Sequence, residues 1–130
     1  DYIIVDLWHK WVLITTVAGA TTLFNATIGE IASTEHGIAF ITDLHDECVT
    51  IAKSEKIKVN DDDLAQQRRF LSDKKSTWSS SMRRDMVNKS KIECAHIFLE
   101  LINIADKNNV ECPSLKTVMI NGEIYMRSLV

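Results

Sequence analysis

The sequence has 130 residues, 45 % of them apolar and 25 % charged, and a formal net charge of −3, which is ordinary for one soluble domain with its own core. Its four glycines and one proline argue against a loop-rich β protein. An odd count of three cysteines without a C-x-x-C pair argues against a disulfide framework and a structural zinc site, and favours a reducing cytosol.

The first third of the sequence predicts a long apolar helical region. The chain begins on Asp1 rather than Met, and we expect it to be part of a longer protein. Apolar side chains on one stripe predict a helix over residues 3–17, with a break at Gly19 and a shorter helical piece over residues 20–32. Residues 11–29 carry no charge, but their five threonines favour a buried helix pair over a membrane span.

A regular 3–4 spacing of apolar residues marks the next helix. Ser33 or Thr34 could cap it, with Glu35 in its first turn, where an acidic side chain suits the helix dipole. The spacing predicts one buried face, made of Ile38, Ile41, Leu44, Cys48, Ile51 and Ala52.

Three further helical patterns complete the chain. The sequence "VNDDDLAQQRRFL" predicts a helix capped by Asn60 or Asp61. The stretch from Ile92 to Asn108 predicts a strong helix, and Cys112-Pro113-Ser114 starts the last one. No alternating strand pattern is present in the sequence. We therefore expect an all-α fold, a compact bundle of about six helices, as a single domain over residues 1–130.

Positive charge gathers in one polar segment. Residues 68–91 hold eight Lys or Arg and two Asp, whereas the rest of the chain is acidic. Such asymmetry marks an anion site or a nucleic-acid surface. The hydroxyls of Ser79, Ser80 and Ser81, with Arg83 and Arg84 nearby, could grip a carboxylate, or they could be plain loop residues.

Two ionisable residues each allow two interpretations. Lys10 lies between Trp8 and Trp11, so its stem could cover apolar surface, or its ammonium could serve as an acid or base in a cleft. Glu93 opens an apolar helix and completes an S-x-x-E capping pattern with Ser90, or it is a catalytic carboxylate. His45 and Cys48 alone are too few for a metal site, so we expect no metal.

Two separated motifs resemble those of the ketopantoate reductase (2-dehydropantoate 2-reductase) family. "LWHKWVLITTVAGATTLFNATIGEI" is similar to that family's W-x-K helix, and "SSSMRRDMVNKSKIECAHIF" to its S-S-M-x-x-D…E segment. "NNVECPSL" resembles the turn into its final helix. The resemblance covers essentially the whole chain and implies the helical C-terminal domain, like that of 6-phosphogluconate-dehydrogenase-type reductases, without the family's N-terminal Rossmann domain.

The resemblance implies a role for each candidate site residue. Lys10 would donate a proton or hydrogen bond to the 2-keto oxygen of ketopantoate, and Glu93 would orient lysine and substrate. Ser81, with Ser80 beside it, would bind the carboxylate of this small anionic 2-oxo acid. NADP(H) would be bound mainly by the missing N-terminal Rossmann domain, so its binding residues are unknown here. The implied product is pantoate, in cytoplasmic pantothenate and coenzyme A biosynthesis.

The sequence departs from the family pattern after the lysine. Many members carry asparagines one and two turns later, where this chain has Ile14 and Ala18. The departure keeps two alternatives open: reduction of another small 2-oxo acid, or a non-catalytic helical interaction domain. A nucleic-acid-binding module using residues 68–91 is a third class, although we expect no nucleic-acid partner. The many apolar faces are compatible with a homodimer.

Overall fold

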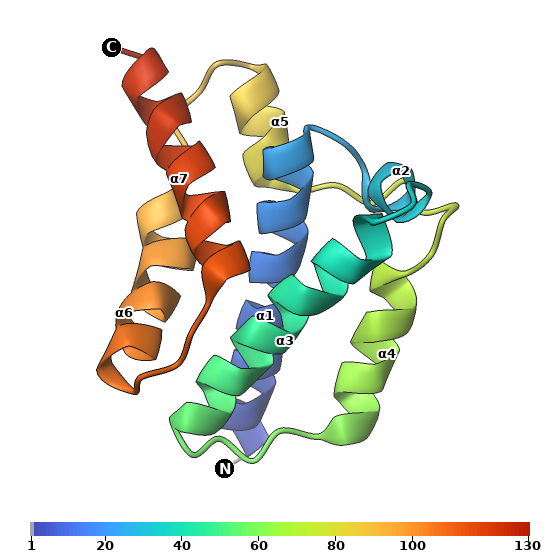
Figure 1. The fold of residues 1–130 in the computed structure, drawn as a ribbon, viewed down its shortest axis with the longest axis vertical. Helices are drawn as coiled ribbons and strands as arrows, with labels where there is room; N and C mark the ends of the chain where they lie inside the picture. The colour runs from blue at the N-terminus through green and yellow to red at the C-terminus, as the bar shows by residue number, and fades with distance from the viewer. Residues whose placement is uncertain (1) are drawn as a thin grey trace.

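Every regular element in the part of the chain that the structure describes is helical (Figure 1). A computed structural model describes residues 2–130, with the side chain of Ala95 outside that description, as Asp1 is. The elements are α1 (Tyr2–Phe24), α2 (Ile28–Ala32), α3 (Gly37–Ser54), α4 (Asp61–Leu71), α5 (Ser81–Val87), the π-helical segment η1 (Ala95–Leu99), α6 (Glu100–Lys107) and α7 (Pro113–Ser128). The predicted all-α fold is confirmed, with α5 as a helix that the sequence patterns did not predict.

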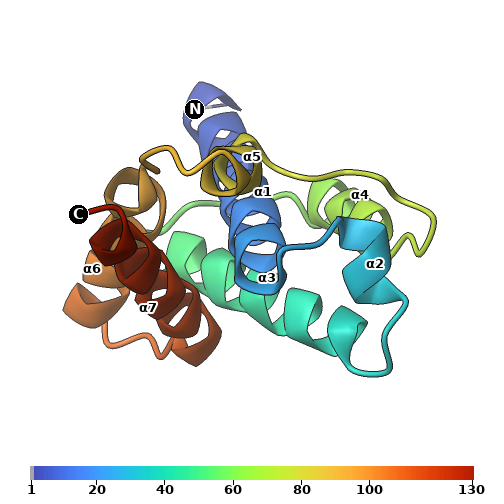
Figure 2. The same ribbon diagram turned by 90° about the horizontal axis from the view of Figure 1, so that it is seen from above.

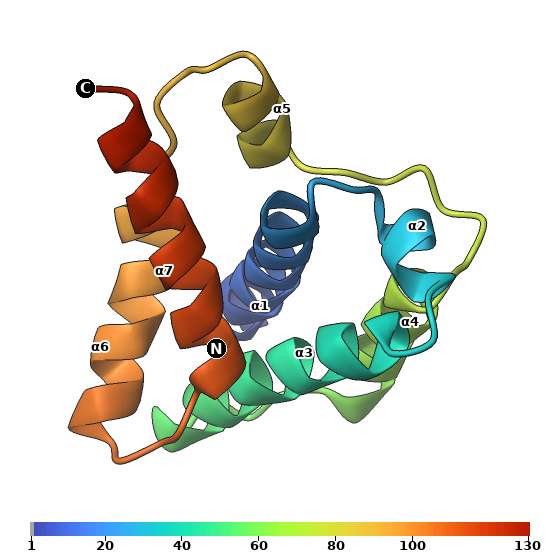
Figure 3. The ribbon, with the colours of Figure 1, turned by 45° about the horizontal axis from the view of Figure 1, so that its top comes forward.

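Helix α1 is the centre of the bundle. Figure 3 shows α1 nearly end-on, with α3, α5 and α7 around it, and the view from above in Figure 2 places α6 and α7 on one side of α1 and α2 and α4 on the other. Ten of its residues are buried, from His9 to Thr22. By length and composition α1 could cross a membrane, but this burial gives it the place of a core helix, as predicted.

The predicted break at Gly19 is wrong, because α1 runs unbroken to Phe24. A Cβ atom at Gly19 would lie 3.0 Å from Leu44 Cδ2 and 3.2 Å from both methyl carbons of Val118. The glycine therefore lets α3 and α7 approach α1 closely. The chain leaves the helix at Asn25 instead, whose φ of 48° is in the left-handed region.

Polar side chains begin and end the short helix α2, including two that were predicted to cap α3. Thr27 and Glu30 form a capping box at its start. The hydroxyls of Ser33 and Thr34 donate to the carbonyls of Gly29 and Ile31, so both close α2 rather than open α3. The prediction that one of them caps α3 is wrong: His36 holds the N-cap position of α3 and makes no side-chain capping bond.

The later helices follow their predicted patterns more closely. The predicted face of α3 packs inward, with five of its six residues buried and Ile38 half-buried. Asn60 caps α4 by accepting from the backbone N–H of Asp63 at 3.0 Å, and Pro113 starts α7 as predicted. The helix expected from Ile92 instead begins as the π-helical segment η1 and continues as α6.

A buried polar network joins α1, α3 and α4. Arg68 Nε donates to Nδ1 of the fully buried His45 at 2.6 Å, so the imidazole proton is on Nε2 and is donated to Gln67 Oε1 at 2.8 Å. Gln67 Nε2 in turn donates to the carbonyl of His9 at 3.0 Å. Burial lowers the pKa of His45 to about 4, which keeps the ring neutral.

Candidate functional site

A cavity of about 230 Å³ lies between α1, η1 and residues 78–81, which lead into α5 and which we call the serine segment. We call the cavity the α1–η1 cavity. Its apolar wall comes from three stretches far apart in the chain, and its lining residues are Ile14, Val17, Ala18, Trp78, Met82 and Ile97, with Ser79, Ser80 and Ser81 as the polar part. Trp78, Met82 and Ile97 were not singled out from the sequence, because nothing local marks an apolar side chain as facing a cavity.

Lys10 is on the same face of α1 as the cavity wall. Ile14 follows it by four residues and Ala18 by eight, so Lys10 lies about 6 Å along the helix axis from Ile14. Its side chain is exposed, and its ammonium has no ion-pair partner among residues 2–130. The ammonium is thus unpaired among the described residues, and Lys10 itself is not one of the residues that line the cavity.

Glu93 lies one turn before Ile97 of η1, as Lys10 lies one turn before Ile14 of α1. Its carbonyl accepts from the backbone N–H of Ile97, a lining residue, at 3.3 Å. Its exposed carboxylate lies 3.5 Å from His96 Nε2, while Glu100 lies 3.6 Å from the other ring nitrogen. The hydrogen bonds of a capping box between Ser90 and Glu93 do not occur among the described residues, so that interpretation of Glu93 is not supported.

A hydrogen bond joins α1 to η1 close to Lys10 and Glu93. The indole N–H of Trp11 donates to the carbonyl of Ile97 at 3.2 Å, across 86 positions of sequence. Trp11 directly follows Lys10, and Ile97 is one turn beyond Glu93. The structure therefore places Lys10 and Glu93 each about one helical turn from a wall of the same cavity. Their catalytic roles remain a prediction.

The three serines differ in what they can offer a ligand. Thr21 donates its hydroxyl proton to the carbonyl of Val17 at 2.6 Å, so Ser80, 2.7 Å away, must donate to Thr21. Ser80 also accepts from the backbone N–H of Arg83 at 3.0 Å as the N-cap of α5. Ser80 thus has no proton left for a substrate carboxylate. Its predicted substrate contact stays a prediction, limited to accepting a hydrogen bond.

The other two serines keep their protons. Ser79 accepts from Arg83 Nη1 at 3.2 Å, which leaves its own hydroxyl proton free. The hydroxyl of Ser81 is exposed and has no partner among the described residues. Ser79 and Ser81 can therefore both donate a hydrogen bond to an anion, and the role that the family resemblance implies for Ser81 stays a prediction.

The basic segment is partly used within the fold. Arg83 donates to Asn25 Oδ1 at 3.1 Å as well as to Ser79, and Arg68 pairs with Asp46. A second cavity, of about 490 Å³, lies on the arginine side of the serines and is lined by Ser79, Ser80, Ser81, Arg83, Arg84 and Val87. The serines therefore stand between an apolar cavity and a basic one.

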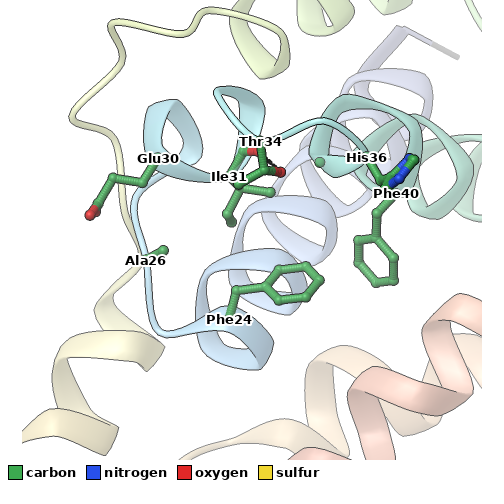
Figure 4. Close-up of a pocket in the computed structure, with 8 residues that line it drawn as sticks. Phe24, Ala26, Glu30, Ile31, Thr34, His36 and Phe40 are labelled. Atoms are coloured by element: carbon green, nitrogen blue, oxygen red, sulfur yellow. Dashed lines mark hydrogen bonds between the residues drawn. The ribbon is translucent and has the colours of Figure 1, made fainter.

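A groove of about 450 Å³ at the far end of α1 contains none of the predicted site residues (Figure 4). Phe24 and Phe40 meet in it edge to face, with ring centroids 5.0 Å apart. The carboxylate of Glu30 on its rim is held by the backbone N–H of Thr27 at 2.9 Å. The groove thus offers apolar surface but no cluster of reactive groups.

Comparison with known proteins supports the resemblance. The family model described as ketopantoate reductase PanE/ApbA, C-terminal, matches residues 3–121. An uncharacterized oxidoreductase, YkpB of Bacillus subtilis strain 168, is 32 % identical over 120 residues, which are 92 % of this chain and 40 % of that protein.

Solved structures agree on the fold. A dimeric ketopantoate reductase from Staphylococcus aureus superposes with a TM-score of 0.86 at 17 % identity, covering 98 % of this chain and 45 % of its own. A D-mandelate dehydrogenase, solved with NADH and anilino(oxo)acetate, superposes at 0.83 with 19 % identity, over 99 % of this chain and 43 % of its own. The chain spans about two fifths of the length of the relatives it matches. Because the family model matches nearly its whole length, the chain belongs to the ketopantoate reductase PanE/ApbA family, an oxidoreductase family, as its C-terminal domain.

Proposed function

We propose that this chain is the substrate-side domain of a reductase that uses NADPH to convert a small 2-oxo acid into the 2-hydroxy acid, with 2-dehydropantoate as the family's reference substrate. One observation carries the proposal: Lys10 and Glu93 each lie about one turn from a wall of a cavity that also contains the Ser81 hydroxyl. The D-mandelate dehydrogenase relative, solved with anilino(oxo)acetate, supports a 2-oxo acid as the class of substrate.

Each residue has a chemical task in this reaction. When a ketone is reduced, negative charge builds on its oxygen, and the Lys10 ammonium stabilises that charge and gives the oxygen its proton. Lys10 is exposed, so it regains a proton from water. Ser81 donates a hydrogen bond to the substrate carboxylate. The carboxylate of Glu93, on the η1 side, orients the lysine and the substrate relative to each other.

The dinucleotide is expected to bind mainly to another part of the protein. Among the described residues no glycine has a positive φ, which a tight glycine-rich turn around a pyrophosphate would need. When bound, the nicotinamide supplies the hydride. The residues of this chain fit the substrate side of that transfer, because they combine a free cation, a hydroxyl donor and an apolar cavity.

The test uses the full-length parent protein. NADPH oxidation is followed with 2-dehydropantoate and with other 2-oxo acids, for the wild type, Lys10→Ala and Lys75→Ala. Lys75 is an exposed lysine in the loop after α4, away from the α1–η1 cavity. We expect kcat/KM to fall by about 10² to 10⁴ in Lys10→Ala only. Equal activity in Lys10→Ala and Lys75→Ala would instead favour a non-catalytic interaction domain.

We also propose that the parent protein is a cytoplasmic homodimer. The Staphylococcus aureus relative is dimeric, and α7 exposes the apolar side chains of Ile120 and Ile124. Sedimentation velocity of the parent protein at micromolar concentration tests this assembly, and a monomer at all concentrations would contradict it.

A further inference from the structure

We propose that Tyr125 of α7 is a positioning residue for the reaction, because its hydroxyl holds the segment before η1 and so fixes the direction of the Glu93 carboxylate. The inference rests on the proposed function, in which Glu93 orients the lysine and the substrate. Tyr125 does not line the α1–η1 cavity, so it acts through Glu93 and not on the substrate.

The segment that carries Glu93 has no helix of its own. Helix α5 ends at Val87 and η1 begins at Ala95, and residues 88–93 belong to neither. On its C-terminal side Glu93 is tied to η1, because its carbonyl accepts from the backbone N–H of Ile97. On its N-terminal side, the position of the segment depends on contacts with other elements.

Helix α7 supplies these contacts from two neighbouring residues. The connection from α5 to η1 passes beside the C-terminal half of α7 (Figure 1), where the Tyr125 hydroxyl donates to the carbonyl of Ser90 and lies 3.4 Å from the carbonyl of Asp85. The sulfur of Met126 accepts from the backbone N–H of Ile92 at 3.4 Å. Tyr125 therefore ties α5 and the segment that follows it to one point on α7.

Burial alternates along the end of this segment. Ile92 and Cys94 are 6 % exposed each, and a Cβ atom at Gly122 of α7 would lie 3.9 Å from Ile92 Cδ1 and 3.2 Å from Cys94 Cβ. Glu93 stands between these two residues in the sequence, and its side chain is 77 % exposed. The packing of both neighbours against α7 therefore turns the Glu93 carboxylate away from that helix.

The hydroxyl of Tyr125 can be removed without removing its ring. The ring is half-buried against the main core, so Tyr125→Phe keeps this packing and loses only the bonds to the two carbonyls. The segment then gains freedom, and the Glu93 carboxylate moves with it. A displacement of about 1 Å far from the reacting atoms can lower a rate by as much as about 10²-fold.

A double-mutant cycle on kcat in the full-length parent protein tests the inference. NADPH oxidation is followed with 2-dehydropantoate, 3,3-dimethyl-2-oxobutanoate and phenylglyoxylate, and the cycle uses the acid with the highest kcat/KM. We expect Tyr125→Phe to lower kcat by about tenfold in the wild type. In the Glu93→Gln background the same change should lower kcat by less than about twofold, because the group through which Tyr125 acts is already gone.

Two further variants serve as control and as second probe. Thr117→Val also removes a hydroxyl bond to a backbone carbonyl, but that bond lies within α7, so kcat should stay as in the wild type. Met126→Leu keeps the volume of the side chain and removes the sulfur that accepts from Ile92. It should lower kcat in the wild type and not in Glu93→Gln, and it decides the matter where Tyr125→Phe does not fold.

The possible failures are distinguishable. An unchanged kcat in Tyr125→Phe, or a fall by the same factor in both backgrounds, overturns the inference and leaves the proposed function standing. A wild-type kcat in Glu93→Gln overturns the inference together with the role proposed for Glu93. The absence of turnover with all three acids, in a parent protein that is folded and binds NADPH, overturns both the inference and the proposed function.

Discussion

Ser80 donates its hydroxyl proton to Thr21 across an Oγ–Oγ1 distance of 2.7 Å, because the proton of Thr21 is already bonded to the carbonyl of Val17. This bond fastens the serine segment to the central helix and leaves only Ser79 and Ser81 with a hydroxyl proton for a ligand. It joins residues 59 positions apart in the sequence, and it relates the cap of α5 to the core of α1.

Removing the acceptor of this bond should loosen the serine segment. Thr21→Val keeps the shape of the side chain but leaves Ser80 without its partner, so we expect a loss of about 1 kcal/mol in the free energy of unfolding. Thr22→Val is the matched control, because Thr22 bonds only carbonyls of its own helix. Urea unfolding of the two variants measures the difference, and equal losses would contradict a separate contribution from Ser80.

Gly29 is predicted to position the serine segment from the other side. The backbone N–H groups of Ile28 and Gly29 donate to the carbonyls of Trp78 at 2.8 Å and Ser76 at 3.0 Å. A Cβ atom at Gly29 would lie 2.2 Å from the Ser76 oxygen, which is backbone and cannot rotate away. Gly29→Ala should therefore cost about 1 to 3 kcal/mol of stability and raise KM in the parent protein.

Gly122→Ala provides the comparison for that variant. A Cβ atom there would lie 3.2 Å from the Cβ of Cys94, which needs a shift of only a few tenths of an ångström, and alanine favours the helix of α7. We expect its stability to change little and its KM to stay as in the wild type. Thermal unfolding measures the stability of both variants, and steady-state kinetics measures their KM. A Gly29→Ala protein that matches Gly122→Ala in both respects would show that the segment is not held by α2.

Glu93→Gln should separate a catalytic carboxylate from a surface ion pair. Glu93 and Glu100 lie at 3.5 and 3.6 Å from the two ring nitrogens of His96. Glu100→Gln therefore removes a similar contact with the same histidine. We expect kcat in the parent protein to fall by about 10² or more in Glu93→Gln alone, because the family resemblance gives the role of acidic partner to Glu93 and not to Glu100. Similar kinetics for the two variants would assign Glu93 a structural role.

The buried His45 makes stability depend on pH. Its pKa is lowered from 6.5 to about 4 in the folded chain, first because burial disfavours the charged ring. The unfolded chain thus binds the proton more readily between pH 6.5 and 4. The contribution of the neutral His45 ring to the free energy of unfolding is fully present above pH 6.5. It is lost as the pH drops from 6.5 to 4, which lowers the free energy of unfolding by up to about 3 kcal/mol.

Urea unfolding of the chain between pH 4 and pH 7.5 measures this dependence. His45→Leu should flatten it over this range, although the variant is less stable at every pH because Gln67 and Arg68 lose a partner. His36→Gln should keep the wild-type slope, since the side chain of His36 is 88 % exposed. An unchanged slope in His45→Leu would assign the pH dependence to other groups.

Local patterns predicted those parts of the fold that depend on local contacts. The buried face of α3, the Asn60 cap of α4 and the Pro113 start of α7 follow from spacing and capping chemistry within a few residues. Gly19 shows where such patterns fail: a glycine inside an apolar helix predicts a break, but its reason is the close approach of Leu44 and Val118. Residues so distant in sequence leave no local mark on the helix that they touch.

The same division applies to the candidate site. The sequence by itself determined the residue types: a lysine between two tryptophans, a run of serines beside arginines, a single carboxylate before an apolar helix, and Ile14 and Ala18 after the lysine. Only the tertiary structure decided that the turn of α1 after Lys10 lies against η1, one turn beyond Glu93, because this depends on the Trp11–Ile97 bond across the bundle. It also decided that Ser79 and Ser81, but not Ser80, keep a proton for a ligand, because a hydroxyl has one proton to donate and Ser80 donates its proton to Thr21.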